Sequence, residues 1–70
     1  MIKAYKTNIT GRQQAYIVET ALYMFLGYDH ISFNLKDKDH TLIIMSKEIR
    51  NDKVINTLKT LNYECELLRR

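Results

Sequence analysis

Apolar residues in this 70-residue chain follow two different spacings, and the order of these spacings constrains the fold more than any other feature. Four segments place apolar residues at every second position, as half-buried strands do. These segments are Ile2–Ile9, His30–Lys36, Thr41–Ser46 and Tyr63–Leu68. Helical spacing of three and four residues runs through Gly11–Leu26 and Asn51–Leu61. The sequence therefore predicts the order strand, helix, strand, strand, helix, strand.

This order of elements favours one architecture. Right-handed crossovers around two helices give an α+β ferredoxin-like βαββαβ sandwich, with both helices on one face of the sheet. The four-stranded antiparallel sheet has the strand order 4-1-3-2. No proline interrupts any element, and the chain has no room for a second core, so residues 1–70 are expected to form one domain.

The first helix has recognisable start and stop signals. Thr10 and Gln13 have the spacing of a capping box, in which each side chain bonds the backbone N–H of the other residue. Gly27 is expected to end the helix in the left-handed conformation. The predicted buried stripe consists of Ala15, Val18, Leu22 and Phe25, with Ile17, Ala21 and Leu26 beside it. Tyr16, Glu19, Thr20 and Tyr23 are expected on the wetter face.

The middle of the chain predicts a hairpin whose polar loop is Asp37–His40. We expect Phe33 to lie opposite Ile44 and Leu35 to lie opposite Leu42. Ile43 and Met45 then point to the other face of the sheet.

The second helix has weaker start and stop signals. Either Ser46 or Asn51 could supply its N-terminal cap, and Asn62 could end it with a positive φ angle. Along the last strand, Cys65 and Leu67 are expected to face inward.

Composition excludes several classes of protein. One cysteine permits no internal disulfide, which fits a reducing cytoplasm. The apolar runs are too short to cross a bilayer, and the N-terminus lacks the apolar core of a signal peptide. A net charge of +3, partly due to a solvated Arg69–Arg70 pair, supports only weak attraction to polyanions. We therefore expect neither a membrane nor a nucleic acid as partner.

Three segments resemble the heavy-metal-associated domains of copper chaperones and metal-transporting ATPases. They are Val18–Leu22, Ile31–Leu35 and the ending Leu61–Leu67, which is similar to that family's Ala-Gly-Tyr-Glu-Val-Glu-Leu. The resemblance covers nearly the whole chain in element order and length, and it implies the same ferredoxin-like fold.

The family's defining Met-x-Cys-x-x-Cys motif is missing. Aligned on Val18–Leu22, the motif's methionine falls on Ile9, its first cysteine on Gly11 and its second on Gln14. Soft Cu(I) prefers thiolate ligands, which neither glycine nor a carboxamide provides. The same alignment places Lys6 where the family has an inward valine, which leaves the facing of the first strand open. The resemblance thus implies the fold and argues against the usual activity.

Other chemistry has little support in the sequence. His30 and His40 lie at opposite ends of the predicted hairpin, and Cys65 falls on an inward strand position, so no metal site or cofactor is expected. No nucleophile has a base placed beside it by any motif, and no glycine-rich phosphate loop is present, so we expect no enzyme. The third strand has no aromatic residue on which RNA bases could stack.

Two candidate binding surfaces remain. The first is the corner where the first strand meets the first helix; it comprises Asn8, Thr10, Gly11, Arg12 and Gln14, with Tyr63 beside it. Free N–H groups and nearby cations there could hold an anion or a carboxylate, although an ordinary capped helix would look the same.

The second candidate is an apolar patch on the uncovered face of the sheet, formed by Ile43, Met45 and Leu68, with Ile2 and Ala4 beside them. Such a patch could bind a partner protein or a second copy, or it could be scattered exposed residues. The sequence therefore favours a non-catalytic interaction or regulatory domain. A divergent metal-binding protein with non-standard or intermolecular ligands is the alternative.

Overall fold

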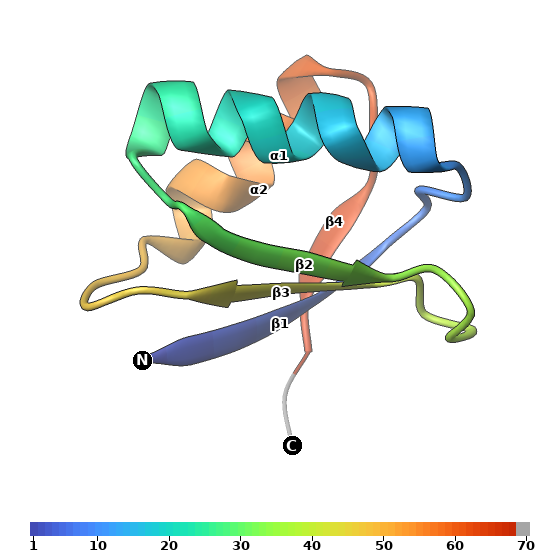
Figure 1. Ribbon diagram of the computed structural model, residues 1–70, viewed down its shortest axis with the longest axis horizontal. Coiled ribbons are helices and arrows are strands. Elements are labelled where there is room, and N and C mark those ends of the chain that lie inside the picture. The colour runs from blue at the N-terminus through green and yellow to red at the C-terminus, as the bar shows by residue number, and fades with distance from the viewer. Residues whose placement is uncertain (69–70) are drawn as a thin grey trace.

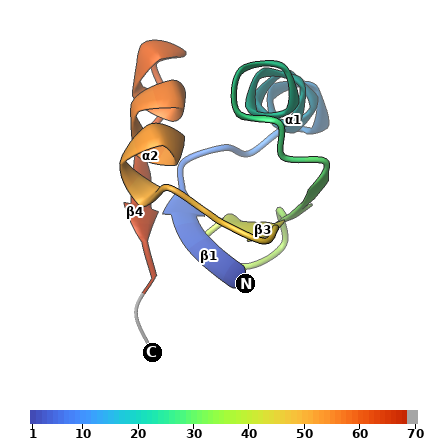
Figure 2. The same ribbon diagram turned by 90° about the vertical axis from the view of Figure 1, so that its left-hand side faces the viewer.

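The computed structural model describes residues 1–68, so the Arg69–Arg70 pair lies outside the described residues. The elements are those predicted, in the predicted order. They are β1 (Ile2–Thr7), α1 (Arg12–Leu26), β2 (His30–Asn34), β3 (Thr41–Met45), α2 (Asn51–Thr60) and β4 (Cys65–Leu67). Figure 1 shows both helices above the sheet, and the turned view in Figure 2 shows that its lower face is left uncovered.

The sheet has the predicted ferredoxin-like topology, with strand order β2-β3-β1-β4 and antiparallel pairs throughout. Tyr5 and Thr7 of β1 are buried, whereas Lys6 is exposed. The first strand therefore faces as its own alternation predicts. Lys6 faces outward, unlike the inward valine at the aligned position of the family, and the strand has not shifted by one residue.

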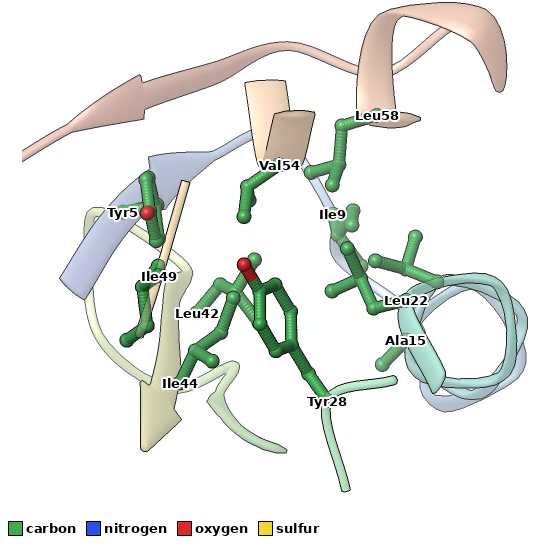
Figure 3. Packing of buried hydrophobic residues seen from close by; sticks show 11 residues of the cluster. Tyr5, Ile9, Ala15, Leu22, Tyr28, Leu42, Ile44, Ile49, Val54 and Leu58 are labelled. Atoms are coloured by element: carbon green, nitrogen blue, oxygen red, sulfur yellow. The ribbon is translucent and has the colours of Figure 1, made fainter. Parts of the chain in front are cut away.

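The core lies between the helices and the sheet. Its fully buried residues include Tyr5 from β1, Leu42 and Ile44 from β3, Leu22 from α1 and Leu58 from α2 (Figure 3). Side chains from both helices meet those of the two central strands, so burial of one sheet face holds the helices and the sheet together.

Two tyrosine hydroxyls attach the start of α2 to the rest of the core. The Tyr5 hydroxyl donates to Asn51 Oδ1 at 2.6 Å, and the Arg50 N–H donates to the Tyr28 hydroxyl oxygen at 3.0 Å. Tyr28 is buried in the connection after α1 (Figure 3). The N-cap position is Arg50, so the predicted caps, Ser46 and Asn51, are both wrong. The Tyr5 hydroxyl bonds the Asn51 side-chain oxygen, which was one of the two predicted caps.

The start of α1 also differs by one residue from the prediction. The N-cap is Gly11 rather than Thr10, and Gln14 rather than Gln13 reaches back. Gln14 Oε1 accepts from the N–H groups of Thr10 and Gly11 at 3.2 and 3.4 Å. Full burial of Ile9 places the turn one residue later along the chain. The end of the helix is as predicted, since Gly27 is left-handed with φ 77°.

The buried stripe of α1 is narrower than predicted. Ala15, Val18, Ala21 and Leu22 are buried, but Phe25 is 75% exposed. Phe25 borders a groove whose other lining residues belong mainly to α2 and include Lys53, so α2 lies beside Phe25 without covering it. The predicted burial of Phe25 is therefore wrong.

The hairpin has the predicted facing but a different register. Phe33 lies opposite Leu42, and Ile31 lies opposite Ile44, which is a shift of two residues from the prediction. Leu35 lies in a longer loop instead of pairing with Leu42. A shift of two keeps every side chain on its predicted face, because side chains alternate with period two.

Asp37 organises the second half of this loop. Its carboxylate accepts from the N–H of Asp39 at 3.3 Å and from the Thr41 hydroxyl at 3.0 Å. Its carbonyl oxygen accepts from the N–H of His40, which has a positive φ of 44°. These bonds close a compact turn over residues 37–41, at the end of the loop.

The end of α2 matches the sequence more closely. Asn62 has φ 68°, in the left-handed region that was predicted for it. Strand β4 is shorter than expected, with three residues, and Cys65 and Leu67 pack against the core as predicted.

We predict that Leu22→Ala lowers the free energy of unfolding by about 2–5 kcal/mol, because the side chain is fully buried. On the same helix, Phe25→Ala should cost less than about 1 kcal/mol. Urea unfolding of both variants, followed by circular dichroism, measures the two losses. Equal losses would contradict the burial pattern described for α1.

Candidate functional site

The corner between β1 and α1 is where the structure brings most of the predicted site residues together. The loop that follows Thr7 runs from Asn8 to Gly11, and α1 begins at Arg12. Asn8 Oδ1 accepts from the backbone N–H of Glu64 at 2.9 Å. This bond fixes the loop against the segment that contains Tyr63, although the two segments are far apart in sequence.

Short hydrogen bonds hold the other side of the corner. The Thr7 hydroxyl donates to the carbonyl oxygen of His40 at 2.6 Å, and the Ile9 N–H donates to the same hydroxyl at 3.2 Å. The Thr7 N–H donates to the carbonyl oxygen of Asp39 at 3.0 Å. The hairpin loop and the corner are thus one hydrogen-bonded unit.

The polar groups of the corner are largely used by the fold itself. The N–H groups of Thr10 and Gly11 already bond the Gln14 carboxamide. Thr10 and Arg12 are exposed, and Tyr63 is half-buried against the core. A carboxamide therefore occupies two of the N–H groups that were predicted to attract an anion, and the corner has the form of an ordinary capped helix.

Ile9, Gly11 and Gln14 stand where the resemblance places the metal motif, and their geometry explains why they cannot supply it. Ile9 is fully buried in the core. Gly11 is the N-cap and has no side chain, although a Cβ atom added there would meet nothing within 4 Å. Gln14 offers oxygen and nitrogen, which are poor ligands for a soft metal.

Cys65 is also poorly placed for metal or redox chemistry. It is half-buried on the inner side of β4, opposite Thr7. Burial raises the pKa of its thiol to about 12, so the thiol is protonated at neutral pH. A protonated thiol is a poor nucleophile.

A cleft of about 450 Å³ opens beside Cys65. Lys6, Lys59, Glu64 and Glu66 contribute equal numbers of positive and negative charges to its wall. This balance gives the cleft no preference for an anion or a cation. Among residues 1–68, no three or more His, Cys, Asp or Glu side chains gather where a metal ion could bind.

The second predicted surface is also brought together by the fold. Met45 pairs with Ile2, and Ile43 pairs with Ala4. The Leu68 N–H donates to the Ala4 carbonyl oxygen at 2.9 Å. Ile2 and Met45 are 63% and 49% exposed, so these residues form an apolar patch on the uncovered face. We call Ile2, Ala4, Ile43, Met45 and Leu68 the sheet patch.

Tyr16 and Tyr23 of α1 are exposed, as predicted, whereas Ile17, predicted beside the buried stripe, is 50% exposed. The sequence reasoning did not recognise that these residues and Met24 form one group of exposed apolar side chains. They repeat at intervals of seven residues, which is a spacing that could have indicated a second apolar face on this helix. It also missed Tyr28, whose place between two elements gives no periodic signal.

Comparison with known proteins supports the fold. No protein-family model matches the sequence, and no curated protein matches it. The solution structure of the yeast copper transporter domain Ccc2a, determined in apo and Cu(I)-loaded states, is similar with a TM-score of 0.79. The match covers 97% of this chain and 94% of that chain, at 16% sequence identity.

This match confirms at the level of the fold the resemblance to heavy-metal-associated domains. Residues 1–68 have their βαββαβ architecture, and the chain has a single cysteine, so a cysteine pair is absent. Within residues 1–68, no helix has the length and apolar character needed to cross a membrane. The chain therefore has the fold of a copper transporter domain without the two-cysteine motif.

The buried Tyr5 hydroxyl and the half-buried Cys65 thiol make the free energy of unfolding fall at alkaline pH. Burial is the main reason that the pKa of Tyr5 is also about 12, with smaller contributions from Cys65 and Tyr28. Ordinary values are 9.0 for the thiol and 10.0 for the phenol. In both cases the folded-state pKa is the higher one, so stability is complete below the unfolded value and is lost as pH rises toward 12.

We predict that the free energy of unfolding falls above about pH 9, where only unfolded Cys65 loses its proton, and falls more steeply above about pH 10, where Tyr5 joins it. Cys65→Ala should flatten the decline between pH 9 and 10, and Tyr5→Phe should flatten only the decline above 10. Urea unfolding at a series of pH values measures these slopes. Unchanged slopes in both variants would contradict the effect of burial.

Proposed function

We propose that this protein is a non-catalytic protein-interaction or regulatory domain that has the fold of a copper transporter domain and does not carry copper. The observation that supports this proposal most directly is the pair Gly11 and Gln14. One has no side chain, and the other uses its side-chain oxygen to bond the N–H groups of the turn. The corner is therefore occupied by its own capping bonds.

The same corner is unsuited to catalysis. Its polar groups bond the backbone, and the nearest thiol has a pKa of about 12. A catalytic nucleophile needs a neighbouring base or a lowered pKa. Cys65 has neither, because burial alone determines its pKa. A free thiol of this kind is stable in the reducing cytoplasm, which is the location we propose.

The sheet patch supports the interaction role. A sheet face without covering helices exposes backbone and side chains together, and apolar residues there are shielded only by a partner. Ile2 and Met45 pair across two central strands, so they present one continuous surface rather than isolated side chains. We propose that a partner protein binds this surface.

Copper binding tests the first half of the proposal. We expect no uptake when the reduced wild-type protein is titrated anaerobically with Cu(I) against a competing chelator and followed by mass spectrometry. The combined change Gly11→Cys with Gln14→Cys should bind one Cu(I), because two thiolates then replace a bare backbone position and a carboxamide. Gly11→Ser with Gln14→Ser is the matched control and should bind none.

Tight copper uptake by the wild type would overturn the proposal and favour the metal-binding alternative. A folded double-cysteine variant that takes up no copper would instead show that the corner does not correspond to the copper motif.

Site-specific cross-linking tests the second half. A photoreactive residue in place of Ile43 should form a defined cross-linked complex in cells, because Ile43 lies in the sheet patch. The additional change Met45→Glu should abolish that complex. The same photoreactive residue in place of Asn56, on the exposed side of α2, is the control and should give none. Identical products from both positions, or persistence with Met45→Glu, would contradict binding at the sheet patch.

A further inference from the structure

Strand β2 leaves one of its two edges unpaired. The sheet order places β3 on one side of β2 and, among residues 1–68, no strand on the other side. Figure 1 shows β2 running below α1. Proteins commonly protect such edges with lysine, with proline or by making the edge strand very short. Strand β4, at the opposite edge, has three residues, whereas β2 has five and contains neither lysine nor proline.

The register identifies which backbone groups of β2 point to the open edge. The Ser46 N–H donates to the carbonyl oxygen of the first residue, so the backbone groups of Ser46 point toward β1. Successive residues of an antiparallel strand alternate in this direction, so Ile43, three residues earlier, bonds β2, where it pairs with Ser32. The N–H and C=O groups of Ile31 and Phe33, on either side of Ser32, therefore point outward. We call Ile31, Ser32 and Phe33 the β2 edge.

An apolar groove of about 630 Å³ lies between the β2 edge and α1. Tyr16, Tyr23 and Met24 of α1 line it and are 70%, 60% and 71% exposed. The side chain of Ile31 lines it from the strand. Because side chains alternate along a strand, a strand added at the β2 edge would direct every second side chain toward α1 and into this groove. The outward backbone groups and the groove thus suit one occupant, an extended segment.

The charges of the groove favour a cationic segment. Among residues 1–68, its charged lining residues are Glu19 and Asp29, and no lysine or arginine lines it. The Asp29 carboxylate lies 2.9 Å from His30 Nδ1. Glu19 is half-buried. A lysine or arginine from a partner would therefore supply the missing positive charge. Pairing β2 with β2 of a second copy would instead place two acidic grooves side by side.

We propose that the β2 edge accepts an extended, basic segment of a partner protein as a fifth, antiparallel strand. Antiparallel pairing matches the rest of the sheet and gives two hydrogen bonds at each of Ile31 and Phe33. Main-chain bonds of this kind supply affinity, and alternate side chains supply selectivity.

The alternation specifies the sequence of the bound segment. Apolar residues lie opposite Phe33 and then opposite Ile31, and their side chains enter the groove. A lysine or arginine two residues later lies opposite Asp29, on the side of the groove that Glu19 also lines. This surface is separate from Ile2 and the other strand β1 residues of the sheet patch, so the inference does not depend on binding there.

A defined peptide tests the proposal. The probe is acetylated and amidated Thr-Thr-Val-Thr-Val-Thr-Lys, titrated into ¹⁵N-labelled wild-type protein and followed by NMR. We expect a dissociation constant on the order of 0.1–1 mM. At saturation, hydrogen exchange of the Ile31 and Phe33 N–H groups should slow by at least about 10-fold, because the peptide then bonds them, whereas exchange of the Ser32 N–H should change by less than about 2-fold.

Matched peptides separate strand addition from other modes of binding. N-methylation of the two valines removes the N–H groups that point to β2 and should weaken binding by at least about 10-fold. N-methylation of the threonines that follow each valine alters N–H groups that point to solvent and should leave binding within about 2-fold. Replacing the final lysine with glutamate should weaken binding by about 3- to 10-fold, because it faces Glu19 and Asp29.

Protein variants locate the site. Tyr23→Ala removes part of the groove wall and should weaken binding by at least about 5-fold. Phe25→Ala is the matched control, because Phe25 is an aromatic residue of the same helix, 75% exposed and outside the groove. It should leave binding within about 2-fold. Ile2→Glu, in the sheet patch, should likewise have no effect, which separates this inference from the function proposed above.

Several outcomes would overturn the proposal. They are no binding by the peptide, no change in exchange at Ile31 and Phe33, equal effects of the two N-methylated peptides, and loss of binding with Ile2→Glu but not with Tyr23→Ala. A free protein that sediments as a dimer and already protects Ile31 and Phe33 from exchange would identify a second copy as the occupant, and would also overturn it.

Discussion

Burial of one sheet face under both helices is the interaction on which this fold depends. A chain of 70 residues with one cysteine has no disulfide to limit its unfolded state, so its stability rests on this apolar contact. The core contains Leu22 from α1 and Val54 and Leu58 from α2. These side chains pack against the central strands of the sheet. The hydroxyls of Tyr5 and Tyr28 then fix the start of α2, because they bond Asn51 and the N–H of Arg50.

The sequence predicts the architecture well because periodicity reports burial directly. The facing of Tyr5 and Thr7, the order of the strands and the left-handed ends at Gly27 and Asn62 all follow from local pattern. The exposure of Phe25 does not follow from local pattern. Periodicity identifies the faces of a helix but does not show how far a neighbouring helix extends over them. The hairpin register does not follow either, because a shift of two residues keeps every side chain on the same face and leaves the alternation unchanged.

The candidate site shows a different limit of sequence reasoning. The missing cysteine pair was evident from residue types at Gly11 and Gln14, and this negative inference needed no coordinates. What the sequence did not reveal is that Gln14 bonds the turn in place of a ligand, or that Asn8 bonds the segment before β4. Both bonds join groups whose proximity depends on the folded chain. The hydrogen bonds of the corner therefore hold the fold together, whereas the exposed residues Ile2 and Met45 of the sheet patch are apolar.

The position of β1 in the sheet has a consequence for how the domain forms. Strand β1 is central, with β3 on one side and β4 on the other, although it is the first element of the sequence. Thr7 pairs with Cys65, which lies 58 residues further along the chain. A ribosome must therefore release nearly all of these residues before the first strand acquires its second neighbour, and loop closure of this length slows pairing. Until β4 pairs with it, one edge of β1 stays open to other strands, which makes this stage prone to wrong strand pairing.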